Sequence, residues 1–202
     1  MCTLVDQLKA TVKRTEVPIL IDQEGGNVQR LTAPNWRNTP PQNVFAKLYE
    51  VDSKSGVKAA KMNARLIAQD LYEVGININC LPVLDIPATH CHPFLRSRVA
   101  GTTVSQSIDL GKATMEGLTA GGVSPVMKHM PGHGRATLDS HDATPTVHAT
   151  RSELSACDFI PFKVLAGCPW GMTAHIIFAN IDPVNPATQS TNIINDIIRK
   201  QI

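Results

Sequence analysis

The segment K-H-M-P-G-H-G-R-A-T-L-D-S-H, residues 128–141, concentrates side chains that can do chemistry. Three of the chain's seven histidines lie in it, with a lysine, an arginine and an aspartate. His129 and His133 stand four residues apart and His141 follows, so metal binding is one hypothesis. Two histidines at that spacing converge on a helix, whereas Pro131 and the glycines beside it disfavour a helix there. The segment therefore predicts a loop without a metal; a metal-dependent hydrolase is the alternative that zinc in the purified protein would reveal.

Proton transfer by His141 is a second hypothesis for the same loop. An imidazole has an unperturbed pKa of about 6.5, so it can give and take protons near neutral pH. Asp139 stands two residues earlier, and a nearby carboxylate favours the protonated ring that donates to a leaving oxygen. We therefore predict that His141 and Asp139 act together in acid/base chemistry.

Four short runs rich in Val, Ile and Leu must position these residues, and each is followed by a segment with helical spacing. An opening helix, in which Leu4, Leu8 and Val12 share one apolar face, comes before the first run. Ser55 is the predicted N-cap of the helix after the first run. The predicted strands are residues 17–22, 76–85, 122–129 and 170–178, and the predicted helices are residues 55–75, 105–120, 152–165 and 190–202, with loops at 27–43 and 86–101.

Strands that alternate with helices are parallel, because each connection must return over a face of the sheet. The pattern predicts an α/β fold, either a barrel or an open sheet. In both, ligands bind at the carboxyl ends of the strands. Polar residues gather at those ends: residues 22–26, Asp85, Lys128 with His129, and His175. We expect a site there.

Composition excludes several classes of protein. The 202 residues are 43% hydrophobic with a formal charge of +2, which is typical of one soluble domain. Basic residues are scattered and aromatic residues make up only 4%, so we expect no nucleic-acid partner. No apolar run is long enough to span a membrane, and no signal peptide is recognised. The five cysteines form no C-x-x-C pair and predict reduced thiols in a cytoplasmic protein.

Four sequence blocks carry a resemblance to a known family. They are I-D-Q-E-G-G-N-V-Q-R-L (residues 21–31), L-P-V-L-D (residues 81–85), the segment 128–141 and A-H-I-I-F-A-N-I-D-P (residues 174–183). In this order they resemble bacterial β-N-acetylglucosaminidases of glycoside hydrolase family 3, cytoplasmic enzymes that recycle cell-wall muropeptides. The run K-H-M-P-G-H-G followed by D-S-H is the most specific of the four.

The resemblance implies a role for seven residues. Arg98 departs from the family pattern, because Arg96 and Ser97 stand where the family usually has Gly-Asp and the aromatic residue usually found soon after is missing. The resemblance assigns substrate binding to Asp22, Arg30, Arg98, Lys128 and His129, and the acid/base pair to His141 and Asp139. We interpret His133 as part of the loop structure, and Glu24, Asp85 and His175 as supporting or packing residues. An ion pair between Arg30 and Glu24 is the structural alternative for Arg30.

The implied activity is the retaining removal of terminal β-linked N-acetylglucosamine, with no metal or organic cofactor. The implied fold is an incomplete (β/α)8 barrel, with residues 1–202 as part of its N-terminal domain and about four βα units present. The family's nucleophilic aspartate follows a strand that we place beyond residue 202. The open strand edges leave three alternatives: a fragment of a longer protein, a shortened gene product, or half of a split barrel that a partner chain completes. The alternative is a catalytically inactive sugar-binding fragment or half of a split barrel.

Overall fold

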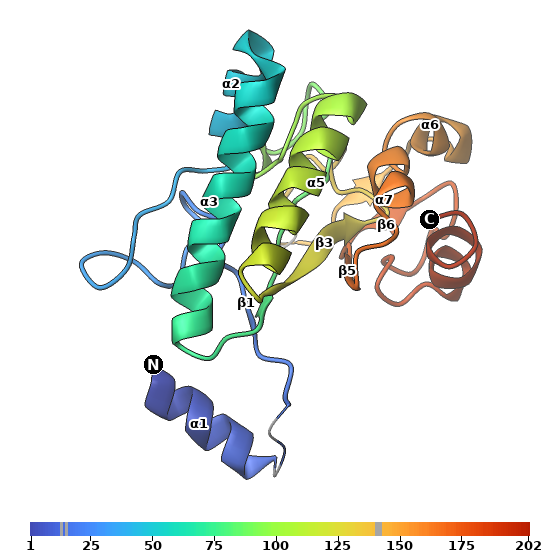
Figure 1. The fold of residues 1–202 in the computed structure, drawn as a ribbon. Helices are drawn as coiled ribbons and strands as arrows, with labels where there is room; N and C mark the ends of the chain where they lie inside the picture. The colour runs from blue at the N-terminus through green and yellow to red at the C-terminus, as the bar shows by residue number, and fades with distance from the viewer. Residues whose placement is uncertain (13, 15, 140–142) are drawn as a thin grey trace.

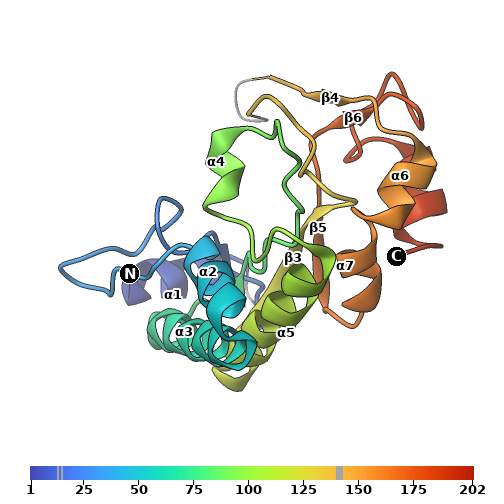
Figure 2. The ribbon, with the colours of Figure 1, turned by 90° about the horizontal axis from the view of Figure 1, so that it is seen from above.

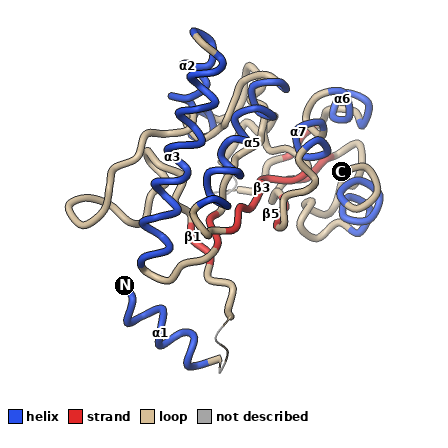
Figure 3. The backbone as a smooth tube through the Cα atoms, viewed as in Figure 1, coloured by secondary structure: helices blue, strands red, loops and turns tan. Residues whose placement is uncertain are grey.

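The computed structural model describes residues 1–12, 14, 16–139 and 143–202. Helices cover the outer face of a layer of short strands (Figures 1 and 3). In chain order the elements are α1 (Cys2–Thr11), β1 (Leu20–Ile21), α2 (Asn43–Val51), α3 (Ser53–Glu73), β2 (Ile78–Asn79), α4 (Pro93–Arg96), α5 (Val104–Ala120), β3 (Ser124–Met130), β4 (Thr146–Val147), α6 (Arg151–Ala156), α7 (Ile160–Val164), β5 (Trp170–Thr173), β6 (Ile177–Phe178) and the π-helix η1 (Ile193–Ile198).

Four of the strands form one parallel sheet in the order β1-β2-β3-β5. Leu20 pairs with Ile78, Ile78 pairs with Ser124, and Val126 pairs with Trp170. Helices α2 and α3 connect β1 to β2, α4 and α5 connect β2 to β3, and α6 and α7 lie between β3 and β5. This alternation confirms the α/β prediction and matches four βα units of an incomplete (β/α)8 barrel.

The single strand predicted over residues 170–178 is wrong. The chain forms β5 there and then β6, which pairs with β4 in a second sheet. Ala174 donates its N–H to the carbonyl oxygen of Met130 at 2.6 Å, whereas Ile177 donates to that of Pro145 at 2.9 Å. The chain therefore passes from one sheet to the other between these two residues.

Two predicted helices also differ from the structure. The segment 152–165 contains two short helices, because Pro161 has no backbone N–H and stands at the start of α7. Thr150 begins α6 with a capping box, in which its hydroxyl accepts the N–H of Glu153 at 3.3 Å. The predicted helix over residues 190–202 is the shorter π-helix η1.

The predicted N-cap Ser55 of α3 is also wrong, and α2 was not predicted. Asp52 caps α3, because its carboxylate accepts the backbone N–H groups of Lys54 at 3.3 Å and Ser55 at 3.2 Å. The Pro- and Asn-rich sequence before residue 43 favoured a loop and gave no signal for the helix behind it.

Helices α3 and α5 lie side by side over the sheet and form its main cover (Figures 1 and 2). Gly117 of α5 lets the two helices approach closely, since a Cβ atom there would lie 2.3 Å from the carbonyl oxygen of Lys61. Ala64 and Ala68 are small, buried residues on the facing side of α3. This close packing fixes the strands beneath and the loops at their carboxyl ends.

The predicted apolar face of α1 is not buried. Leu4, Leu8 and Val12 are 52%, 49% and 50% exposed, and Val5 is the buried residue of this helix. Val5 belongs to the main apolar cluster with Leu71 of α3, so α1 contacts the rest of the chain along a different stripe.

In the part of the chain that the structure describes, no helix has the length and apolar character needed to cross a bilayer.

Candidate functional site

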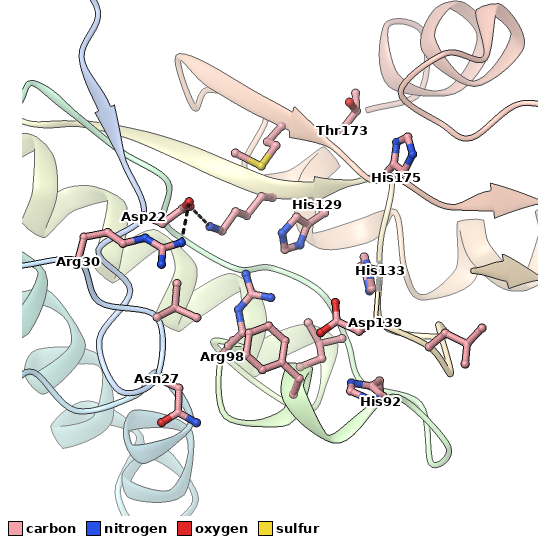
Figure 4. A pocket seen from close by; sticks show the side chains of 16 residues that line it. Asp22, Asn27, Arg30, His92, Arg98, His129, His133, Asp139, Thr173 and His175 are labelled. Carbon is pink, nitrogen blue, oxygen red and sulfur yellow. Dashed lines mark hydrogen bonds and ion pairs between the residues drawn. The ribbon is translucent and has the colours of Figure 1, made fainter. Parts of the chain in front are cut away.

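A cavity of about 290 Å³ lies where the sheet strands end. Side chains from several strand ends and loops point toward it (Figure 4). The predicted site residues that line it are Asp22, Arg30, Arg98, Lys128, His129 and Asp139. His141 lies outside the described residues. The structure thus brings six of the seven predicted residues together.

Parallel strands explain this convergence, because their carboxyl ends meet at one edge of the sheet. Asp22 directly follows β1, and Lys128 and His129 belong to β3. Val83 forms a parallel bridge with Lys128, which carries the pairing beyond β2 and brings Asp85 beside the end of β3. Residues far apart in the sequence therefore meet through the register of the sheet.

Lys128 places a buried ammonium group below the cavity. Its side chain is 1% exposed, and its Nζ lies 2.9 Å from Oδ1 of Asp22 and 2.6 Å from Oε1 of Glu24. Burying a charge without partners is costly, and the two carboxylates offset that cost. An ammonium carries three N–H donors, so these two contacts leave one for a further acceptor.

Arg98 and Glu24 form a two-bond ion pair. Nε of Arg98 donates to Oε2 of Glu24 at 2.9 Å, and Nη2 donates to Oε1 at 2.8 Å. Burial alone would raise the pKa of Glu24, but Arg98 and Lys128 outweigh burial and lower that pKa below its ordinary value. Glu24 is therefore an anion held by Arg98 and Lys128, and the alternative pairing with Arg30 is wrong.

Asp85 forms hydrogen bonds with residues at and just beyond the end of β3. Its Oδ2 lies 2.7 Å from Nδ1 of His129, and its Oδ1 accepts the backbone N–H groups of His129 at 3.2 Å and His133 at 2.6 Å. Burial would raise the pKa of Asp85, but the two histidines lower it. Because a carboxylate only accepts hydrogen bonds, it holds the proton on Nδ1 and leaves Nε2 of His129 for a ligand.

The pair of Asp22 and Arg30 is looser and more exposed. Nη2 of Arg30 lies 3.8 Å from Oδ2 of Asp22, and the side chains are 63% and 38% exposed, respectively. Burial opposes ionisation of Asp22, but Lys128 and Arg30 outweigh it and lower the pKa of Asp22. An exposed ion pair is weak, so Arg30 can reorient toward a ligand.

Several lining residues received no site role from the sequence. The ring of Phe94 lies under the guanidinium of Arg98, with the Cζ atom 4.9 Å from the ring centroid. His92 lines the cavity, and its buried Nδ1 has no hydrogen-bond partner among the residues the structure describes. Loops after parallel strands commonly carry binding residues, which is the signal that loop 86–101 offered. The lining residues without an assigned role include Asn27, His92, Phe94 and Thr173, and His175 had only a supporting one.

Gly134 fits the loop after β3 against the loop after β2. A Cβ atom at Gly134 would lie 1.8 Å from the carbonyl oxygen of Ile86, and the Gly134 carbonyl accepts the N–H of Ala88 at 2.9 Å. His133, which the sequence assigned to loop structure, also lines the cavity, and burial lowers its pKa. The glycine at 134 therefore serves close backbone contact between the two loops.

The cavity is equipped for hydrogen bonding to a small polar ligand. Among the described residues, no group of three or more His, Cys, Asp or Glu side chains is placed to hold a metal ion. Carboxylate, ammonium, guanidinium and imidazole groups surround the space instead, and charged groups make the stronger hydrogen bonds. Such a set can accept from and donate to several hydroxyl groups of one ligand at once.

Comparison with known proteins places the chain in a family. Residues 2–202 match the N-terminal domain of glycosyl hydrolase family 3. The chain belongs to glycosyl hydrolase family 3. Its relatives in this family include the beta-hexosaminidase of Alkalilimnicola ehrlichii, which is 34% identical over 98% of this chain and 57% of its own length. That of Neisseria meningitidis serogroup B is 32% identical over 99% of this chain and 55% of its own length. The chain thus spans about half the length of these curated relatives.

Solved structures of the same family share the fold. The crystal structure of NagZ from Neisseria gonorrhoeae in complex with N-trifluoroacetyl-D-glucosamine matches with a TM-score of 0.91 at 32% identity, over 98% of this chain and 58% of that chain. A family 3 beta-N-acetylglucosaminidase from a Paenibacillus species matches with a TM-score of 0.85 at 33% identity, over 98% of this chain and 38% of that chain. The resemblance drawn from the sequence is confirmed for the family and the fold.

Proposed function

We propose that this chain forms the sugar-binding part of a β-N-acetylhexosaminidase, within the barrel domain of that enzyme. The proposed reaction removes terminal β-linked N-acetylglucosamine from glycosides of the cell-wall muropeptide type. One observation carries the proposal: five residues assigned to sugar binding surround one cavity in a chain of this family. They are Asp22, Arg30, Arg98, Lys128 and His129.

Each side chain has a role that its contacts support. Asp22 accepts hydrogen bonds from neighbouring sugar hydroxyls, because one edge of its carboxylate faces the cavity beside Lys128. Lys128 donates with the N–H that its two carboxylates leave over. His129 contributes Nε2, and Arg98 contributes the guanidinium N–H groups that Glu24 does not take.

The proposed chemistry is double displacement with retention at the anomeric carbon. A carboxylate attacks that carbon while an acid protonates the leaving oxygen. In the second step the same acid, now deprotonated, takes a proton from water, and the water releases the sugar. We assign the acid/base role to His141 with Asp139. Neither step requires a metal or an organic cofactor.

Among the described residues that line the cavity, Asp22 and Asp139 carry carboxylates, and neither has the role of attacking the anomeric carbon in this proposal. Asp22 is engaged by Lys128 and Arg30, which suits a group that binds hydroxyls and not one that attacks carbon. We propose that the nucleophile comes from residues outside this chain. Sugar binding without hydrolysis, by this chain alone or by half of a split barrel, is the second candidate that this engagement of Asp22 favours. The five free cysteines support a cytoplasmic setting for either candidate.

Sugar titration by calorimetry tests the binding proposal. N-acetylglucosamine should bind the 202-residue chain more tightly than glucose, and Arg98→Met should weaken that binding. Arg37→Met is the matched control, because Arg37 pairs with Asp70 at 3.3 Å outside the cavity lining. Equal affinity for the two sugars, or equal effects of the two substitutions, would contradict the proposal. Phenol release from an aryl β-N-acetylglucosaminide is then compared between residues 1–202 alone and a longer protein that contains them. Hydrolysis by the longer protein only is the result expected of a hydrolase whose nucleophile lies outside this chain, and hydrolysis by neither favours a sugar-binding protein.

A further inference from the structure

Glu24 does not line the cavity, yet it contacts two of the cations that do. Its side chain is 1% exposed. Its Oε1 lies 2.6 Å from Nζ of Lys128 and 2.8 Å from Nη2 of Arg98, and its Oε2 accepts a second bond from Nε of Arg98 at 2.9 Å. One carboxylate thus binds an ammonium group from β3 and a guanidinium group from the loop after α4.

These contacts decide which donors remain for a ligand. A guanidinium has five N–H donors, and Glu24 takes two of those on Arg98 along one edge. The ammonium of Lys128 has three donors and loses one to Glu24 and one to Asp22. The position of the Glu24 carboxylate therefore determines the direction in which the remaining N–H groups of Lys128 and Arg98 point.

Hydrogen bonds and close packing hold the backbone of Glu24 in place, and this restricts the position of its carboxylate. Its N–H donates to the carbonyl oxygen of Val28 at 2.8 Å, and its carbonyl oxygen accepts from Nε2 of Gln42 at 2.8 Å. Gly25, the next residue, has a φ of +95° and would bring a Cβ atom within 2.3 Å of the carbonyl oxygen of Pro40. The chain around Glu24 is closely packed and bonded on both sides.

We infer that Glu24 is a positioning residue, which aims the free donors of Lys128 and Arg98 at the hydroxyl groups of the bound sugar. This inference rests on the proposed function. It differs from a purely structural ion pair in one measurable way. A structural pair would affect the stability of the fold, whereas a positioning residue also sets how well the site distinguishes one hydroxyl pattern from another.

The test compares two substitutions at Glu24 with a matched control. Glu24→Gln keeps the shape but removes the charge and presents an amide N–H₂ to cations that need acceptors. Glu24→Asp keeps the charge on a side chain shorter by one methylene group, which cannot hold both cations at their present distances. The control is Glu116→Gln, because Glu116 pairs with Nζ of Lys61 at 2.7 Å on the surface of α5, outside the cavity lining.

The measurements are the affinity for N-acetylglucosamine, the affinities for its monodeoxy analogues and the thermal midpoint of each protein. Glu24→Gln should weaken N-acetylglucosamine binding about 10- to 100-fold, the range for lost hydrogen bonds with charged groups. It should also reduce the preference of the site for the intact sugar over at least one deoxy analogue. Glu24→Asp should show a smaller loss of the same kind, and Glu116→Gln should change neither quantity.

The outcomes separate this inference from the proposed function. If the unsubstituted chain does not bind N-acetylglucosamine, the proposed function and the inference both fail. If it binds and both Glu24 variants keep the same affinity and the same preference, the inference alone fails. Unfolding of both variants would also overturn it, because Glu24 would then be required for the fold itself. A loss of sugar discrimination in a folded variant is the result that we expect.

Discussion

Replacement of Lys128 by Met separates the effect of burial from the effect of ion-pair distance. Two Lys–Glu pairs among the described residues have nearly equal length. Nζ of Lys128 lies 2.6 Å from Glu24, with both side chains 1% exposed, and Nζ of Lys61 lies 2.7 Å from Glu116, with the side chains 50% and 45% exposed. The change Lys→Met removes the charge at similar length in both places.

The two substitutions should differ several-fold in their effect on the free energy of unfolding. Removing one partner of a buried ion pair typically costs about 3–5 kcal/mol, because the other charge is left buried. Arg98 still holds Glu24, and Asp22 is 38% exposed and can be hydrated, so we expect about 3 kcal/mol for Lys128→Met. An exposed pair contributes about 0–1 kcal/mol, which is the range we expect for Lys61→Met.

Urea unfolding measures this difference. With an m-value of about 2–3 kcal/mol per molar urea, Lys128→Met should lower the midpoint by about 1–1.5 M, and Lys61→Met by less than about 0.5 M. N-acetylglucosamine binding should be lost only in Lys128→Met. Equal midpoint shifts for the two variants would refute the conclusion that burial makes the Lys128 pair important, and would mean that the site around Glu24 is hydrated.

The remaining predictions concern acid sensitivity, the support of His129 and the acid role. The folded-state pKa values of Asp22 and Glu24 are lowered, so their contribution to stability is present above about pH 5 and is lost as the pH falls through the lowered values. The urea midpoint should therefore decrease as the pH is lowered from 7 to 3, and an unchanged midpoint would count against these ion pairs. Asp85→Asn should lower the free energy of unfolding by about 1.5–3 kcal/mol. It should also let the proton of His129 move between Nδ1 and Nε2, which the nitrogen chemical shifts of the ring report. An unchanged tautomer would show that another group determines it. In a hydrolytically active form of the protein, His141→Ala should slow substrates with poor leaving groups by about 10²- to 10⁴-fold and activated aryl glycosides far less; a uniform loss would reject the acid role.

The sequence alone determined the order of the elements and the types of residue at the site. The strand at β3 and the helix at α5 were predicted within two residues, because each has a continuous local pattern of apolar residues. Polar residues after the strands indicated the edge where a site would form, since parallel strands end together. The family motifs in the same local stretches named five residues that line the cavity, and the spacing from Asp85 named a sixth, Arg98.

Tertiary contacts decided the ends of several elements. Between β5 and β6 the apolar pattern continues, but the backbone changes its hydrogen-bond partner from β3 to β4. The apolar stripe of α1 was visible in the sequence, yet Val5 packs inward and Leu4 and Leu8 are exposed. Local periodicity cannot report which neighbour an element meets, so these features required the fold.

Only the tertiary structure decided which cationic side chain pairs with which carboxylate. Lys128 and Asp22 are 106 residues apart and Arg98 and Glu24 are 74 residues apart, so no local spacing could pair them. The sequence placed Glu24 among supporting residues and left a pairing with Arg30 open. In the structure, the register of the sheet brings Lys128 to Glu24, and the loop after α4 brings Arg98. Ion pairing in a buried site depends on distance and desolvation, and both are properties of the folded chain.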